Sequence, residues 1–210
     1  MDTSNITVLK SAIVSSILEV IYTHPIDVIK THQQNSNPFT FSRELFKGIS
    51  VRAVGIIPIR TSFWTGQYVS DSIGIIEPLS KSLFVGLIQT LIDTPIENAK
   101  IKQIYSLKKY RMYRGFIPHY MRNSMFLYSF IKSNELIENK LIAGATGGFV
   151  GSIITHPLDS YKTLVQSNKY TPVINYKQWF NGLYARCLIC TISMTIGNWS
   201  YNYLLENVFD

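Results

Sequence analysis

An acid and a base stand three residues apart at three places in this chain of 210 residues. Each pair follows a proline, which gives the pattern proline, any residue, Asp or Glu, two residues, Lys. Its three copies are Pro25, Asp27 and Lys30; Pro95, Glu97 and Lys100; and Pro157, Asp159 and Lys162. Such side chains can form ion pairs, either within one helix, where residues three apart are neighbours, or between helices. The prolines are 70 and 62 residues apart, which indicates one structural unit copied three times.

A second pattern repeats with the same period. An aromatic residue, then Lys, Arg or Asn, then Gly stand at 46–48, 113–115 and 180–182, so both intervals are 67 residues. The apolar stretches between these marks predict six helices, at roughly residues 7–34, 49–71, 79–105, 116–135, 140–167 and 183–206. Pro25, Pro95 and Pro157 fall inside the odd-numbered helices. We expect each proline to kink its helix, because proline removes a backbone hydrogen bond.

The composition favours a membrane protein over a soluble domain. Charged residues make up 16% of the chain and hydrophobic residues 46%, with a mean hydropathy of +0.11. A soluble domain usually carries about 25% charged residues. Each predicted helix is long enough to cross about 30 Å of hydrocarbon. The modest hydropathy suits helices with one face toward lipid and another toward a wet interior, and therefore a bundle around a cavity.

The charge and the cysteines exclude several other function classes. The net charge of +7 is compatible with a nucleic-acid partner. Much of it lies in short connections such as residues 108–114, where it suits one side of a membrane, so we expect no nucleic acid. Cys187 and Cys190 form a single C-x-x-C with no second pair, and we expect neither a metal site nor a cofactor. No nucleophile with its base and no phosphate loop is recognisable, so we expect no enzyme.

The three two-helix repeats, with the proline, acid and base at the end of every odd helix, resemble the mitochondrial carrier family over nearly the whole chain. The resemblance implies an all-α membrane protein. Its six transmembrane helices, in three tandem two-helix repeats, would form a pseudo-threefold barrel around a central cavity. The repeats would be residues 1–74, 75–137 and 138–210 of one transmembrane domain. The resemblance also implies a monomeric, multi-pass protein of the mitochondrial inner membrane, with both termini on the intermembrane-space side.

In that family the acids and bases of the three patterns form a ring that closes the matrix end of the cavity. By resemblance the pairs would be Asp27 with Lys100, Glu97 with Lys162, and Asp159 with Lys30. The alternative is three intrahelical pairs, each contributing a few tenths of a kcal/mol. We favour the ring, because charged groups at membrane depth are costly unless they are paired or hydrated. Family members often brace the ring with a glutamine four residues beyond the base, a position matched by Gln34 and Gln166.

The other end of the cavity departs from the family pattern. Even-numbered helices of the family usually end in Tyr or Phe, an acid, two residues and a base. Here no acid follows Tyr68, Tyr128 or Tyr201. An ion-pair ring cannot form in the usual way, and we expect this end to open more readily. The departure leaves room for uniport in place of exchange, or for a diverged protein that no longer transports.

Substrate contacts in the family lie midway along the even helices, seven residues beyond the glycine of the second pattern. The residues at or near these positions, together with other side chains that we expect to serve the cavity, are Glu19, Arg52, Gly55, Arg122, Asn123, Arg186 and Ile189. Glu19 and Lys30 point in nearly the same direction, because eleven residues are close to three helical turns. Arg122 suits a carboxylate or phosphate and Glu19 a cationic group, which suggests a zwitterion. For each such residue the alternative is a structural ion pair, and we expect Arg60 and Asp93 to be structural.

The short first connection, Gly55 and Arg122 are similar to the S-adenosylmethionine carriers of the family. S-adenosylmethionine, or another zwitterionic or carboxylate solute, is therefore the first hypothesis, and a nucleotide or deoxynucleotide is the alternative. A receptor or scaffold that does not transport is the hypothesis of another class. Four residues of the second pattern suit a lipid phosphate, by resemblance that of cardiolipin. They are Lys47, Gly48, Arg114 and Gly115.

Overall fold

All regular structure in the described part of the chain is helical. The computed structural model describes residues 3–34, 49–105, 111–167 and 179–207. The helices in these ranges are α1 (Thr3–Gln34), α2 (Ile49–Ser72), α3 (Pro78–Tyr105), α4 (Phe116–Leu136), α5 (Lys140–Gln166) and α7 (Leu183–Asn207). Five of the six predicted helices agree with these bounds to within one residue at each end. The first helix begins at Thr3, earlier than predicted.

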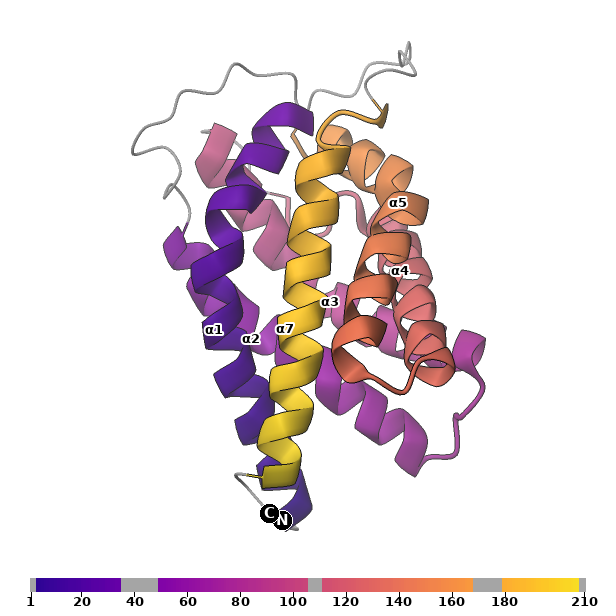
Figure 1. The fold of residues 1–210 in the computed structure, drawn as a ribbon. Helices are drawn as coiled ribbons and strands as arrows, with labels where there is room; N and C mark the ends of the chain where they lie inside the picture. Colours follow the sequence, from indigo (N-terminus) through magenta and orange to yellow (C-terminus); the bar gives the residue numbers. More distant parts are fainter. Residues whose placement is uncertain (1–2, 35–48, 106–110, 168–178, 208–210) are drawn as a thin grey trace.

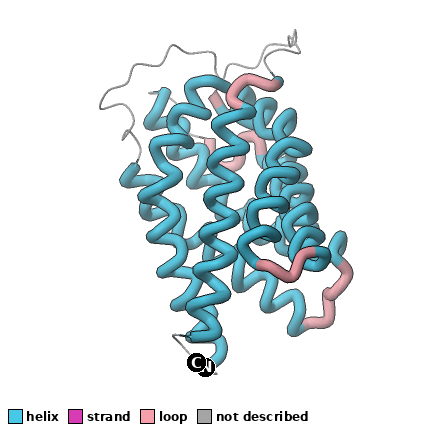
Figure 2. The backbone as a smooth tube through the Cα atoms, in the orientation of Figure 1, coloured by secondary structure: helices cyan, strands magenta, loops and turns pink. Residues whose placement is uncertain are grey.

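The helices run side by side in one bundle (Figure 1). Each helix packs against the next one along the chain, and α1 also packs against α7, so that the sequential order closes into a ring. The first residues of α1 and the last residues of α7 lie at the same end of the bundle. The short turns that follow α2 and α4 lie toward that end as well (Figure 2). We call it the terminal end, and the other the loop end.

The repeated patterns of the sequence mark places where the backbone is constrained. Pro25, Pro95 and Pro157 lie inside α1, α3 and α5, as predicted. Gly115 and Gly182 directly precede α4 and α7 and have φ angles of 74° and 78°. Only glycine adopts this left-handed conformation without strain, which explains the glycine of the second pattern. Its first copy, Gly48, lies outside the described residues.

The helices α3 and α5 begin at polar side chains that cap their N-termini. The Glu77 carboxylate accepts hydrogen bonds from the backbone N–H groups of Ser80 at 2.6 Å and Leu79 at 3.0 Å, at the start of α3. These bonds hold the pKa of Glu77 below its ordinary value. The Asn139 side chain accepts from the N–H of Leu141 at 3.0 Å, at the start of α5. Both caps satisfy backbone donors that a helix leaves unpaired at its N-terminus.

Glycines on two faces of α5 allow its neighbours to approach closely. A Cβ atom at Gly144 or Gly148 would lie 2.5 Å from a carbonyl oxygen of α7. A Cβ atom at Gly147 would lie 3.0 Å from the backbone of Phe130 on α4, and one at Gly151 would touch the same helix. Small residues at four-residue spacing let helix backbones meet in this way. As a result, side chains of α4 and α7 both reach the centre of α5.

The bundle is apolar outside and polar inside. On α3, Leu83, Leu87 and Leu91 are 42%, 41% and 46% exposed, and two apolar grooves of about 560 Å³ each lie on the outer surface. Asp159 and Arg186 are among many polar side chains that are buried. Within the described residues, α5 has the length and hydropathy of a membrane span. Exposed apolar faces around a polar interior favour lipid as the surrounding solvent.

We expect Gly148→Ala to destabilise the protein, although alanine is a better helix former than glycine by about 1 kcal/mol. The new methyl group would overlap the Cys190 carbonyl oxygen, and overpacking of this kind costs about 1–3 kcal/mol. Gly197→Ala is the matched control, because the nearest atom to a Cβ there is on Trp64, 4.0 Å away. Thermal unfolding of the purified protein in detergent should show a lower midpoint for Gly148→Ala only. Equal midpoints would contradict the close contact between α5 and α7.

Candidate functional site

A polar cavity of about 130 Å³ lies inside the bundle. Its lining comes from α2, α3, α4, α5 and α7. The lining residues are Ile56, Ile59, Arg60, Phe63, Gln89, Asp93, Glu97, Arg122, Asn123, Phe126, Lys162, Arg186, Ile189, Cys190, Ser193 and Met194. They include four Lys or Arg residues and two acids. The outer grooves are larger but apolar, so the chemistry of the protein is concentrated in this cavity.

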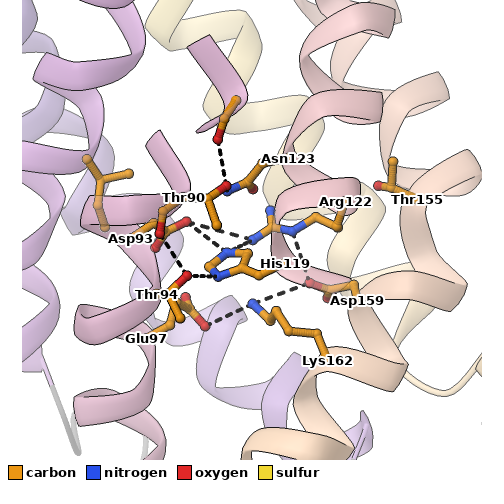
Figure 3. A network of polar contacts seen from close by, with 12 residues as sticks. Thr90, Asp93, Thr94, Glu97, His119, Arg122, Asn123, Thr155, Asp159 and Lys162 are labelled. Atoms are coloured by element: carbon orange, nitrogen blue, oxygen red, sulfur yellow. Dashed lines mark hydrogen bonds and ion pairs between the residues drawn. The ribbon is translucent and has the colours of Figure 1, made fainter. Parts of the chain in front are cut away.

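Glu97, in the part of α3 nearer the loop end, contacts two lysines, and Figure 3 shows its contact with Lys162. Its carboxylate lies 3.2 Å from the ammonium of Lys162 on α5, the inter-repeat pair that the sequence predicts. It also lies 3.4 Å from the ammonium of Lys100, three residues along its own helix. Glu97 therefore makes one contact between repeats and one contact within its own helix, the two kinds that were posed as alternatives. The side chains of Asp27 and Lys30, which complete the predicted ring, lie outside the described ones.

Asp159 is a fully buried acid surrounded by bases from three helices. Its carboxylate lies 2.5 Å from the guanidinium of Arg186 on α7, 3.6 Å from Arg122 on α4 and 3.7 Å from Lys162 on its own helix. Arg186 also donates to the hydroxyl of Thr155 at 2.6 Å. A buried charge requires such partners, because desolvation of an unpaired ion costs several kcal/mol. The partner predicted for Asp159 was Lys30; the described residues add Arg122 and Arg186, which the sequence assigned to the substrate.

A histidine joins α3 to α4 within the same network. His119 is fully buried. Its Nε2 atom lies 3.1 Å from the Asp93 carboxylate and 2.8 Å from Arg122, and its Nδ1 atom lies 3.0 Å from the Thr94 hydroxyl. Arg122 is therefore shared between His119 and Asp159, and it also lines the cavity.

Aromatic side chains close the bundle on the terminal-end side of the cavity. Trp64 on α2 stacks on Tyr201 on α7, with ring centroids 4.2 Å apart and planes 7° apart. Phe63 and Phe130 pack edge to face at 5.5 Å beside them. All four rings are at most 9% exposed. The ion pairs Lys81–Asp71 and Lys132–Glu135 lie toward this end, but each has a partner more than 40% exposed. The closure is thus aromatic where the family pattern has charges.

The structure brings part of the predicted substrate set together. Arg122, Asn123, Arg186 and Ile189 line the cavity, and the Asn123 amide donates to the Thr90 hydroxyl at 2.9 Å. Gly55 is not among the lining residues. A Cβ there would overlap the Ile96 side chain, so this glycine lets α2 and α3 meet. The side chains of Glu19 and Arg52 lie outside the described ones.

The predicted brace and lipid residues are described only in part. Gln166 is buried and donates to the backbone carbonyl of Arg114 at 3.4 Å, which ties α5 to the turn before α4. Gly115 opens α4. The side chain of Gln34, and Lys47 with Gly48, lie outside what is described.

Three residues in or beside the cavity were not assigned to the site by sequence reasoning. Arg60 and Asp93, which we expected to be structural, both line the cavity, and Arg60 donates to Ser193 across it. His119 was not predicted at all. An alignment of the repeats could have indicated His119, because it stands four residues after Gly115 just as Arg186 stands four residues after Gly182.

Comparisons with known proteins point to the mitochondrial carrier family. A family model described as "Mitochondrial carrier protein" matches residues 133–196. "Mitochondrial carrier-like protein L276" of Acanthamoeba polyphaga mimivirus is 30% identical over 119 residues, 53% of this chain and 48% of the relative. "Mitochondrial substrate carrier family protein H" of Dictyostelium discoideum is 27% identical over 167 residues, 75% of this chain and 42% of the relative. The chain spans about half the length of these curated relatives.

We expect Asp159→Asn to destabilise the protein strongly. Loss of the carboxylate leaves Arg186, Arg122 and Lys162 close together without the acid that they share, and breaking a buried pair costs about 3–5 kcal/mol. Glu135→Gln is the matched control, since it removes an acid from an exposed pair with Lys132. Thermal unfolding in detergent should give a much lower midpoint for Asp159→Asn and little change for Glu135→Gln. Similar midpoints would show that Asp159 does not organise the interior.

Proposed function

Because this chain belongs to the mitochondrial carrier family, we propose that it carries a small charged solute across the mitochondrial inner membrane by alternating access. The observation that supports this most directly is the polar cavity, which lies between two closures of different chemistry. Alternating access requires one central site and a closure on each side that can open independently. A packed interior without such a cavity would suit a scaffold better.

The closed ring of helices and the recurrence of the patterns support a pseudo-threefold barrel of six spans. In this arrangement residues 1–74, 75–137 and 138–210 are its three repeats, and the chain works as a monomer. The terminal end, with its aromatic closure, faces the intermembrane space, so both termini lie on that side. The loop end, with Glu97, Lys162 and Asp159, faces the matrix.

The charges around the cavity favour a solute that carries a carboxylate or a phosphate. The lining contains Arg60, Arg122, Lys162 and Arg186 against two acids. A guanidinium fits the planar or forked oxygens of either group. S-adenosylmethionine has a carboxylate but two cationic groups, so it also requires an acid such as Glu19. The phosphates of a nucleotide can pair with the excess of Lys and Arg side chains without a further acid. Both classes of solute therefore belong in the first transport screen.

The cavity must expand before it holds such a solute. Its volume of about 130 Å³ is well below the roughly 300–1,000 Å³ of most small-molecule sites. We therefore infer that this cavity is contracted and that transport requires a wider state. Opening the matrix side exchanges the contacts of Glu97 and Lys162 for water, which is feasible because partly hydrated ion pairs are individually modest.

Bound lipid would steady the matrix side of the barrel. Gly115 precedes α4 with a left-handed conformation, and the backbone N–H groups that begin a helix attract anions. Together with Arg114, and with Lys47 and Gly48 in the first repeat, this geometry suits the phosphates of cardiolipin. No cofactor or metal is needed for this function.

We expect the purified protein in liposomes to take up an anionic or zwitterionic solute, and Arg122→Gln to reduce the rate at least tenfold. Losing a charge-assisted hydrogen bond to an ionised solute costs about 1.5–3 kcal/mol, and 1.4 kcal/mol corresponds to tenfold. The screen should load S-adenosylmethionine, nucleotides, deoxynucleotides and amino acids. The companion variant Lys100→Ala with Lys162→Ala should change transport sharply, because it removes two bases that contact Glu97.

Lys132→Gln is the control for charge removal, because Lys132 is exposed and pairs with Glu135 away from the cavity. Its uptake rate should stay close to that of the unaltered protein. Uptake that survives Arg122→Gln unchanged would refute the assignment of the site. No uptake of any solute, by protein that unfolds cooperatively, would favour a receptor or scaffold.

A further inference from the structure

Two titratable side chains meet in the second repeat where the third repeat has a hydroxyl and a permanent cation. In the third repeat, Arg186 donates to Thr155 at 2.6 Å. Thr155 stands two residues before Pro157, and Arg186 four residues after Gly182. The same two positions of the second repeat hold Asp93 and His119, whose Oδ2 and Nε2 atoms lie 3.1 Å apart. The contact occurs in both repeats, but only in the second repeat are both of its side chains titratable groups.

The hydrogen bonds around His119 suit a neutral ring that carries its proton on Nδ1. The Thr94 hydroxyl lies 2.7 Å from the Thr90 carbonyl, to which it can donate its one hydrogen. In that arrangement it accepts from Nδ1 of His119, 3.0 Å away. Nε2 is then left with a lone pair, which accepts from the Arg122 guanidinium at 2.8 Å.

The same Nε2 atom cannot serve both of its neighbours. It accepts from Arg122 only while it is unprotonated, and it donates to the Asp93 carboxylate only once it is protonated. A proton on Nε2 creates a charge-assisted hydrogen bond to Asp93. It also removes the acceptor for Arg122 and places a like charge beside it. Arg122 then loses this partner and keeps its longer contacts with the carboxylates of Asp93 at 3.8 Å and Asp159 at 3.6 Å, and it lines the cavity where a solute would bind.

We propose that Asp93 and His119 form a proton-binding site, and that one proton enters with each anionic solute that Arg122 binds. This proposal rests on the proposed function. The proton comes from solvent through Asp93, which lines the cavity, and it leaves from Nε2 when the solute is released on the other side. Coupling is reciprocal, because an anion on Arg122 reduces the repulsion that a protonated His119 meets. The protein is thereby an anion and proton symporter.

The charged groups that face His119 from the packed helices support this coupling. Asp93 and Glu97 lie on α3, Arg122 on α4 itself, and Asp159 and Lys162 on α5. With the solute absent, the positive charges of Arg122 and Lys162 oppose protonation of the His119 ring, and the negative charge of Asp93 favours it. A bound anion therefore shifts the balance toward the protonated ring.

The sharpest test transfers the third-repeat pair into the second repeat. In liposomes with the solute found by the transport screen, lowering the external pH from about 8 to about 6 should raise uptake several-fold. The double variant Asp93→Thr with His119→Arg should lose this pH response, because an arginine carries its charge at every working pH. Lys132→Gln should keep the response. A double variant that responds to pH as the unaltered protein does would overturn the proposal.

A second measurement does not depend on transport. The chain has four histidines, and nitrogen NMR of histidine-labelled protein, with His119→Asn for assignment, can follow protonation of the His119 ring. In Arg122→Gln the titration midpoint should rise by about one pH unit or more, and in Asp93→Asn it should fall. An identical midpoint in all three proteins would refute the site even if transport occurs. Failure of the liposome screen alone would count against the proposed function instead.

Discussion

The ion pairs of Asp159 hold the interior of this bundle together. The carboxylate has no contact with solvent, and it meets guanidinium or ammonium groups from α4, α5 and α7. Three bases can converge on one acid only because glycines on opposite faces of α5 allow α4 and α7 to pack within backbone contact distance. Close helix packing is therefore a condition for these ion pairs. A larger residue at the glycine positions would separate the helices, and each buried charge would then lack the partner that offsets its desolvation.

Three copies of one unit supply the same positions with different chemistry. The position two residues before each motif proline holds Thr23, Asp93 and Thr155, and the position four residues after each glycine holds Arg52, His119 and Arg186. In both described copies these two positions are in contact. The backbone plan is retained while the side chains diverge. An asymmetric solute requires this divergence, because a site with true threefold symmetry could not distinguish the ends of the molecule that it binds.

The sequence predicts the helices well because their ends are set by local signals. Glycine with positive φ begins α4 and α7, and side-chain caps begin α3 and α5. The pair of Glu97 and Lys162 was expected from the resemblance to the mitochondrial carrier family, in which the acid of one repeat pairs with the base of the next. The partners of Arg122 are not predictable in this way. Which acid a long side chain reaches depends on the rotation and separation of helices, and those follow from packing on α5. A single histidine in an apolar stretch usually indicates a core residue, so His119 becomes informative only beside Asp93.

The two closures respond to different forces, and this difference assigns them different parts in a transport cycle. Stacked rings such as Trp64 and Tyr201 are held by burial of apolar surface, and a charged solute offers them nothing in exchange. The ionic closure is different, because Arg122 belongs at once to the Asp159 cluster and to the cavity. An anion that binds Arg122 competes with Asp159 for the same guanidinium and weakens that closure as it binds. In the proposed transport cycle the solute therefore acts directly on the loop end, whereas the terminal end opens through movement of the helices that carry the rings.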